Sequence, residues 1–377
     1  MVQTKKDPVL AVLSLSGGND GLNCVIPRNN GHYRDARPTI AVPEDQIIPL
    51  TDEVGLHPTM GPLKKYWDEG KLTVFVGIGY PTPSYSHFRS MDIWHTCEPE
   101  AIGTEGWLGR ATKQLDPNSE NVLTAVNFGR GLPRALVMDG VPVASVGNLE
   151  TYGLLTGIEG ENQRNDALEV FGRMYAPAIG TGAVMDYIHQ TGTDALKGAD
   201  ILSTAPDAYT SSVEYSSTAI GQYMKNIAQT HLAGFGTRVL YTTSPYNGFD
   251  SHANQLQANS GLLSDVSNTV DNFMTDLREH DASDEVTLMF FSEFGRRVKD
   301  NGSGTDHGAG GHCFIIGDRV KGGLYGEYPS LEANALDAGD LQFNTDFRSV
   351  YSTILEKWMG LDAKPIVGGE FEQLAFV

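Results

Sequence analysis

Short apolar runs recur along this chain and predict strands that are buried on both faces. The runs contain β-branched or aromatic residues and end in glycine or polar residues, which is typical of central strands in a parallel sheet. They occupy residues 9–16, 72–79, 237–243, 286–292 and 313–317. Two or three shorter strands are expected between residues 122 and 147.

Apolar residues spaced three or four positions apart predict helices between these strands. The longest helix follows His252, and the last begins near Thr345, which we expect to be its N-cap. The others are expected over residues 60–69, 87–97, 106–115 and 208–232. Buried strands that alternate with helices indicate an α/β fold, in which a mostly parallel central sheet has helices on both faces.

The length of 377 residues allows a large core, and we expect one domain over residues 1–377. An insertion or cap within residues 125–235 is compatible with the weak periodicity of that stretch. Residues 21–60 are polar and rich in proline and glycine, which predicts a long loop after the first strand.

The composition excludes several classes of partner. A formal net charge of −20 disfavours binding to nucleic acid or to anionic membranes, because phosphates repel such a surface. No stretch approaches the ~18 apolar residues of a membrane span. Cys24, Cys97 and Cys313 are widely separated, and we expect them to be small buried residues without a disulfide. The composition leaves the oligomeric state open.

Carboxylates and histidines follow several of the predicted strands. They are Asp20, Asp250, His252, Glu293, Asp306 and His307. The carboxyl ends of parallel strands meet at one edge of a sheet, where ligands bind, so these side chains form a candidate metal site. Carboxylates with imidazoles suit Zn²⁺, Mn²⁺ or Fe, whereas carboxylates alone suit Mg²⁺ or Ca²⁺. Taken singly, each residue is equally compatible with a turn former, a helix cap or a packed surface residue.

Ser86 and His87 stand at the start of a predicted helix. A serine in this place is usually an N-cap. A helix N-terminus also presents free N–H groups that suit an anion, and a hydroxyl that faces a metal there could attack phosphorus or sulfur. Arg296, Arg297 and Arg348 could hold an anionic substrate, because guanidinium pairs bidentately with phosphate or sulfate, or could form structural ion pairs.

A set of motifs, in this order along the chain, resembles the DUF1501 family. The motifs are SGGNDGLN at 16–23, Ser86-His87-Phe88, GWLGR at 106–110, Asp250-Ser-His252, SEFGR at 292–296, GTDHG at 304–308 and DFRSVY at 346–351. This family is grouped with the alkaline phosphatase-like superfamily, which includes sulfatases and metal-dependent phosphoglycerate mutases. The resemblance therefore implies an alkaline phosphatase-like three-layer sandwich. It also implies a periplasmic or secreted protein, although this chain shows no leader.

The resemblance also implies roles for individual residues. Asp20 would be the metal-binding aspartate of the first strand, Ser86 the nucleophile, and Asp250 and His252 a ligand pair. The further candidates implied at the site are His87, Glu293, Asp306, His307 and His312. Phe294 stands where the superfamily would place a metal-binding histidine, so a second metal site would be incomplete, completed by other carboxylates, or absent.

Our first hypothesis is a hydrolase of phosphate or sulfate esters that depends on a divalent metal (Zn²⁺, Mn²⁺, Mg²⁺ or Ca²⁺). Ser86 would be the nucleophile, the six carboxylates and histidines named above would bind metal, and His87, Arg296, Arg348 and His312 would contact the anionic ester. The alternative is a catalytically inactive protein, stabilised by metal, that binds a glycan, a surface partner or copies of itself. A mutase or transferase is a third hypothesis and would need an acceptor pocket.

Overall fold

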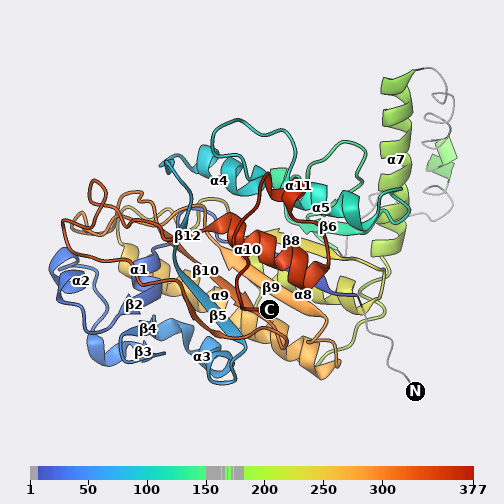
Figure 1. Ribbon diagram of the computed structural model, residues 1–377. Helices are drawn as coiled ribbons and strands as arrows, with labels where there is room; N and C mark the ends of the chain where they lie inside the picture. The colour runs from blue at the N-terminus through green and yellow to red at the C-terminus, as the bar shows by residue number, and fades with distance from the viewer. Residues whose placement is uncertain (1–6, 150–162, 164–165, 168, 171–172, 174–181) are drawn as a thin grey trace.

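A computed structural model describes residues 7–149 and 182–377, with residues 163, 166–167, 169–170 and 173 (Figure 1). Within these residues, one large sheet contains β1 (Val9–Ser14), β5 (Leu72–Gly79), β6 (Ala125–Phe128), β7 (Ala144–Val146), β8 (Val239–Thr243), β9 (Val286–Phe291), β10 (Gly311–Ile316), β11 (Gly323–Tyr325) and β12 (Thr345–Asp346). The order is β11-β5-β10-β9-β1-β8-β6-β7, and β12 also pairs with β5. β1 lies at the centre, where Val12 pairs with Tyr241 of β8 and with Met289 of β9.

Helices cover both faces of this sheet, as the sequence predicts. One face packs against α3 (Gly61–Asp68), α8 (Ala219–Leu232) and α9 (Gln255–Glu279). The other face packs against α4 (His87–Thr96), α5 (Trp107–Leu115), α10 (Phe347–Thr353), its π-helical continuation Ile354–Met359, and α11 (Lys364–Val367). α7 (Ala183–Leu202) contacts β7 at the edge of the sheet (Figure 1). The α/β architecture with a mostly parallel sheet is confirmed.

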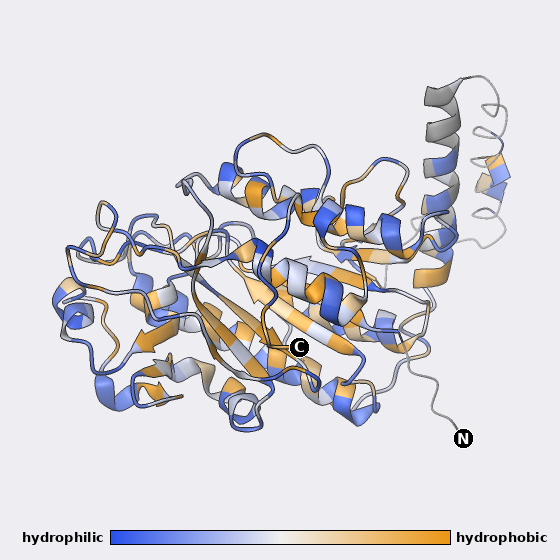
Figure 2. Cartoon of the chain, viewed as in Figure 1, coloured by the Kyte–Doolittle hydropathy of each residue, from blue (hydrophilic) through white to orange (hydrophobic). Residues whose placement is uncertain are grey.

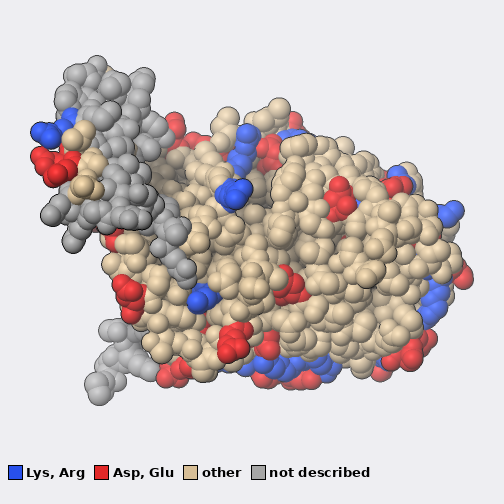
Figure 3. Space-filling model, turned by 180° about the vertical axis from the view of Figure 1, so that it is seen from behind, with Lys and Arg blue, Asp and Glu red and all other residues tan. Residues whose placement is uncertain are grey.

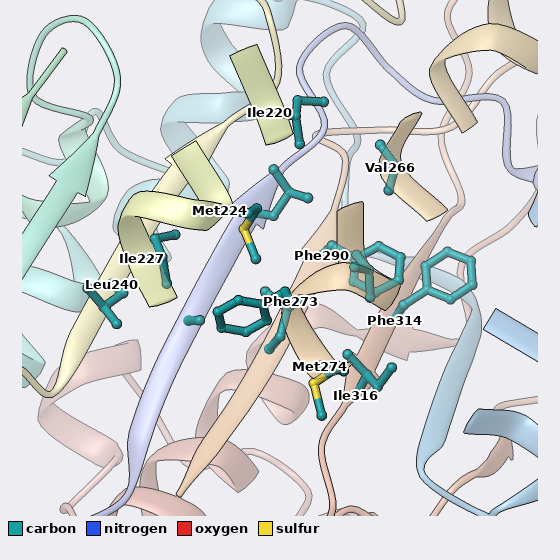
Figure 4. Packing of buried hydrophobic residues seen from close by; sticks show 14 of the residues in the cluster. Ile220, Met224, Ile227, Leu240, Val266, Phe273, Met274, Phe290, Phe314 and Ile316 are labelled. Carbon is teal, nitrogen blue, oxygen red and sulfur yellow. The ribbon is translucent and has the colours of Figure 1, made fainter. Parts of the chain in front are cut away.

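The core follows from the alternation of side chains along buried strands. In β1, Ala11 and Leu13 join the cluster under α8 and α9, whereas Leu10 and Val12 join the cluster under α4 and α10. The strands are accordingly apolar along their length (Figure 2). In the first cluster, the rings of Phe290 and Phe314 stack with their centroids 4.7 Å apart (Figure 4).

Several local predictions differ from the structure. β10 runs antiparallel to its neighbours β5 and β9, because residues 292–310 return the chain beside β9 without a crossover helix. Residues 21–60 form short elements and not one loop: α1 (Gly21–Cys24), β2 (Val25–Pro27), α2 (Gly31–Ala36), β3 (Ile48–Pro49) and β4 (Val54–Leu56), in which the strands make a small antiparallel sheet.

Two helix starts also differ. Asp346, and not Thr345, caps α10, because its side chain accepts the N–H of Arg348 while Thr345 pairs in β12. Helix α8 begins at Ala219, later than residue 208, behind the Thr218 side-chain cap. The prediction of an insertion or cap within 125–235 falls partly on residues outside those described. The three cysteines are buried and free.

The described surface mixes both signs of charge. On the face shown in Figure 3, acidic and basic side chains lie mainly along the margins, and much of the centre carries neither. Of the helices in the described residues, none is both long and apolar enough to cross a membrane.

The turn after β1 is tightly fitted against the segment after β8. Gly17 has a φ of +119°, and a Cβ atom there would lie 2.5 Å from the backbone nitrogen of Asp250. Gly70 also has a positive φ, of +67°, but a Cβ atom there would meet nothing within 4 Å. Gly70 therefore carries the cost of a left-handed backbone alone, whereas Gly17 combines a less accessible φ with close contact.

We predict that Gly17→Ala lowers the free energy of unfolding by at least about 3 kcal/mol, because it adds a backbone collision to conformational strain. Gly70→Ala is the matched control and should cost about 1 kcal/mol. Urea denaturation of the two variants tests this. Equal losses would contradict the close fit of the turn.

His95 on α4 predicts how stability depends on pH. Burial lowers the pKa of His95 to about 4, and its Nε2 lies 3.1 Å from the Tyr241 hydroxyl. An unfolded histidine has a pKa of about 6.5, so between pH 6.5 and 4 the unfolded chain binds a proton that the folded chain does not. The stability contributed by neutral His95 is thus complete above pH 6.5 and is lost as the pH falls toward 4.

We expect His95→Gln to reduce the slope of unfolding free energy against pH in that window, by up to about 1.4 kcal/mol per pH unit. His32→Gln, at an exposed position on α2, should leave the slope unchanged. Chemical denaturation at several pH values measures both slopes. An unchanged slope in His95→Gln would show that this histidine is not held neutral.

Candidate metal centre

Three loops bring ligand atoms together at the carboxyl edge of the sheet. His87 begins α4, Asp250 follows β8 and His307 precedes β10, and their ligand atoms all lie within 4.8 Å of one another. His87 Nε2 is 3.3 Å from Asp250 Oδ2, and His307 Nε2 is 3.1 Å from Asp250 Oδ1. The group thus offers two imidazole nitrogens and one carboxylate.

Glu293 fixes the orientation of His87. Glu293 is buried after β9, its carboxylate accepts the backbone N–H of Gly17, and Oε1 lies 2.8 Å from His87 Nδ1. The carboxylate can only accept here, so Nδ1 carries the proton, and neutral His87 has its lone pair on Nε2. This Nε2 is buried and has no hydrogen-bond partner. The hydrogen bond to Glu293 raises the pKa of His87, although burial opposes it.

His307 is held in the same way by a backbone carbonyl. Its Nδ1 lies 2.7 Å from the carbonyl oxygen of Tyr85, which can only accept, so the neutral ring has its lone pair on Nε2. That atom faces Asp250. An imidazole whose far nitrogen donates to a carboxylate or a carbonyl is the usual arrangement of a metal-binding histidine.

These residues fit a divalent cation. Two lone pairs and a carboxylate that face one another repel unless a proton or a cation lies between them. Ligands about 2.0–2.1 Å from a tetrahedral Zn²⁺ are about 3.3 Å apart, close to the separations seen here. Two imidazoles and one carboxylate suit Zn²⁺, Mn²⁺ or Fe better than Ca²⁺.

Arg296 supports Asp250 from behind. Its guanidinium lies 2.8 Å from Asp250 Oδ1 and donates to the carbonyl oxygens of Gly17, Gly18 and Thr305. Partial burial alone would raise the pKa of Asp250, but the hydrogen bonds from Arg296 and His307 outweigh it and lower the pKa to about 2. Arg296 is only 2% exposed, so the structure places it between loops and not at a surface open to substrate.

His252 and Asp306 lie at the open side of the group. His252 Nε2 is 3.0 Å from Asp250 Oδ1 and 3.1 Å from His307 Nε2. Its Nδ1 is 3.2 Å from Asp306 Oδ1, and Asp306 is exposed. Nε2 of His252 therefore lies where it could add a further ligand atom, with Asp306 beside the other ring nitrogen.

Asp20 lies apart from the group. Its carboxylate pairs with the buried guanidinium of Arg37 at 2.6 Å and also accepts from Gln255. Arg37 in turn donates to the carbonyl oxygens of Arg297 and Val298. The positive charge beside Asp20 is thus supplied by an arginine from the stretch that the sequence predicts as a loop.

Phe294 fills the space beside the group. Its ring centroid is 4.9 Å from that of His87 and 4.8 Å from that of His307, and its ring packs on Gly18. An aromatic ring has no ligand atom. The space that a second cation would need next to these histidines is therefore occupied by apolar atoms.

Two other predicted substrate contacts lie elsewhere. His312 is buried against Gly21, and burial lowers its pKa to about 4. Arg348 pairs with Asp346 at 2.7 Å and stacks over Phe371. Neither residue contacts the three-residue group.

Ser86 lies directly before His87 at the start of α4. It occupies the N-cap position, but its side chain makes no capping hydrogen bond, and the residue is exposed. The Ser86 side chain therefore does not act as the expected N-cap. The uncapped N-terminus of α4 and the Ser86 hydroxyl line the same hollow as His87 and Glu293.

The solved structures that match this chain have low similarity to it. A phosphonate monoester hydrolase of Agrobacterium radiobacter is 12% identical, with a TM-score of 0.44 over 98% of this chain and 79% of that one. An alkaline phosphatase superfamily protein from Vibrio parahaemolyticus is 10% identical, with a TM-score of 0.40 over 98% and 71%. The periplasmic domain of EptC from Escherichia coli, in complex with Zn, is 10% identical, with a TM-score of 0.40 over 84% and 75%.

Sequence comparison gives a more specific result. None of the curated proteins matches this sequence. A family model described as "Protein of unknown function (DUF1501)" matches residues 9–371, which contain the whole sheet and every residue of the candidate centre. The chain belongs to the DUF1501 family.

Proposed function

We propose that this protein is a metal-dependent hydrolase of phosphate or sulfate esters with Ser86 as its nucleophile. The observation that carries the proposal is the position of the Ser86 hydroxyl. It is exposed, free of a capping bond, and one residue from His87, whose Nε2 faces Asp250. The proposed nucleophile is thus adjacent in sequence to His87, one of the three candidate ligands, at the start of α4.

The N-terminus of α4 favours an anionic substrate. The first N–H groups of a helix have no partner within the helix, and here no side chain caps them. Such a terminus attracts phosphate or sulfate through these donors and the helix dipole. The ester anion would therefore bind against the same residues that present Ser86.

His87, Asp250 and His307 would hold the cation, with His252 as an additional ligand. A bound divalent cation would polarise the ester and lower the pKa of the attacking hydroxyl. Ser86 Oγ forms a bond to phosphorus or sulfur while the alcohol oxygen leaves and takes up the proton that the hydroxyl gives up. Water then attacks the same centre, which releases inorganic phosphate or sulfate and restores the Ser86 hydroxyl.

Phe294 favours a second function, namely that of a non-catalytic protein stabilised by metal. Its ring excludes a second cation from the side of His87 and His307 that it covers. A single bound cation without turnover of any phosphate or sulfate ester would support this alternative.

We predict that the full chain binds one Zn²⁺ and that His87→Ala and His307→Ala each weaken binding by at least tenfold. Glu293→Gln should weaken it by about 10- to 100-fold, because it removes the acceptor that orients His87. His32→Ala, on the exposed surface of α2, is the control. Calorimetric titration with Zn²⁺ measures all four variants, and unchanged affinity in both His→Ala variants of the centre would rule out this metal site.

We further predict that Ser86→Ala reduces turnover of phosphate or sulfate monoesters by on the order of 10³-fold or more. Its Zn²⁺ affinity and melting temperature should stay at the level of the unchanged chain, since the side chain makes no capping bond. Ser330→Ala, at an exposed serine far along the chain, is the control. Full turnover by Ser86→Ala would remove this residue from the mechanism.

A further inference from the structure

The three most exposed large apolar side chains among the described residues gather at one place. Phe88, Ile102 and Tyr246 are 78%, 78% and 71% exposed, and no other large apolar side chain exceeds 48%. They come from three separate segments, namely the start of α4, the loop after α4 and the loop after β8. Single exposed apolar residues are ordinary, but a cluster of this kind marks a binding surface.

All three side chains line a single hollow of about 490 Å³. The same hollow is lined by Ser86, His87 and Glu293. Its volume lies within the range of ligand pockets, about 300–1,000 Å³. A molecule that reaches the Ser86 hydroxyl from this side would therefore contact the apolar rim.

The charged residues of the hollow are already paired. Asp92 accepts from Arg89 at 2.7 Å and from Arg134 at 2.9 Å, and Glu293 bonds to Gly17 and His87. Burial keeps His95 neutral near pH 7, with a pKa of about 4. The two guanidiniums share one carboxylate, so the wall offers no free carboxylate to a cationic group, and the apolar rim provides contact area.

We infer that this hollow receives the alcohol part of the ester, and that this part carries no positive charge and has a flat apolar face such as an aryl ring. The inference rests on the proposed function, because the ester group must lie at Ser86. Phe88 and Tyr246 supply aromatic surfaces on which a ring can pack, and Ile102 supplies a third apolar contact. Preference among esters would then be set by these three side chains.

Phosphonates that cannot be hydrolysed at the ester position test this directly. With Zn²⁺ present, the full chain should bind phenylphosphonate at least about tenfold more tightly than methylphosphonate, because the ring buries apolar area in the hollow. A cationic ring, as in 4-(aminomethyl)phenylphosphonate, should bind more weakly than phenylphosphonate, because two guanidiniums line the hollow and its carboxylates are paired. Calorimetric titration measures the three affinities.

Phe88→Ala and Tyr246→Ala should each reduce the preference for phenylphosphonate by at least about threefold, and the double variant should reduce it further. Both side chains are exposed, so truncation leaves the core intact. Leu132→Ala is the control, since Leu132 is 44% exposed and lines a different pocket beside α7. The control should keep the full preference.

Equal affinity for the two simple phosphonates, or tighter binding of the cationic ring, would overturn the inference. If Ser86-dependent turnover were still present, the proposed function would stand without the inference about the hollow. A preference for the ring without any turnover would support the pocket and overturn hydrolysis. If Phe88→Ala dissociated a dimer in sedimentation and left the preference unchanged, the rim would be an interface between copies, and the inference would fail.

Discussion

The candidate centre depends on the buried guanidinium of Arg296. This side chain follows β9 and donates to the turn after β1 at Gly17 and Gly18, to the loop before β10 at Thr305, and to Asp250 after β8. Arginine carries only donors, so one residue satisfies carbonyl oxygens from several loops and a carboxylate together. Its loss would leave these acceptors buried and unpaired, which would lower the free energy of unfolding. The four loop segments keep their relative positions because of this group.

Each of three carboxylates at this edge has its own basic partner, and this pairing shapes the chemistry. Asp20 pairs with Arg37, Asp250 pairs with Arg296, and Glu293 bonds to His87. These basic side chains therefore supply part of the positive charge that metal ions would otherwise supply. Together with the ring of Phe294, this supports a proposed centre for a single cation, at which His87 and His307 supply neutral nitrogens.

Local sequence patterns were sufficient for the central strands β1, β5, β8, β9 and β10 and for the edge at which the candidate site lies. They could not give the direction of β10, because apolar periodicity carries no direction. They could not give the partner of Asp20 either, because Arg37 reaches it only through the fold of residues 21–36, which reads locally as a polar loop. Sequence reasoning placed His87 with the substrate and Glu293 with the metal. In the structure His87 belongs to the candidate group and Glu293 bonds to its Nδ1, a contact across 206 positions of sequence that no local pattern reveals.

The most direct test of this account is anomalous diffraction at the zinc absorption edge from crystals of the full chain grown with Zn²⁺. The account predicts one peak within bonding distance of His87 Nε2, His307 Nε2 and a carboxylate oxygen of Asp250. A peak at Asp20 and His312 instead, or none beside His87 and His307, would contradict it.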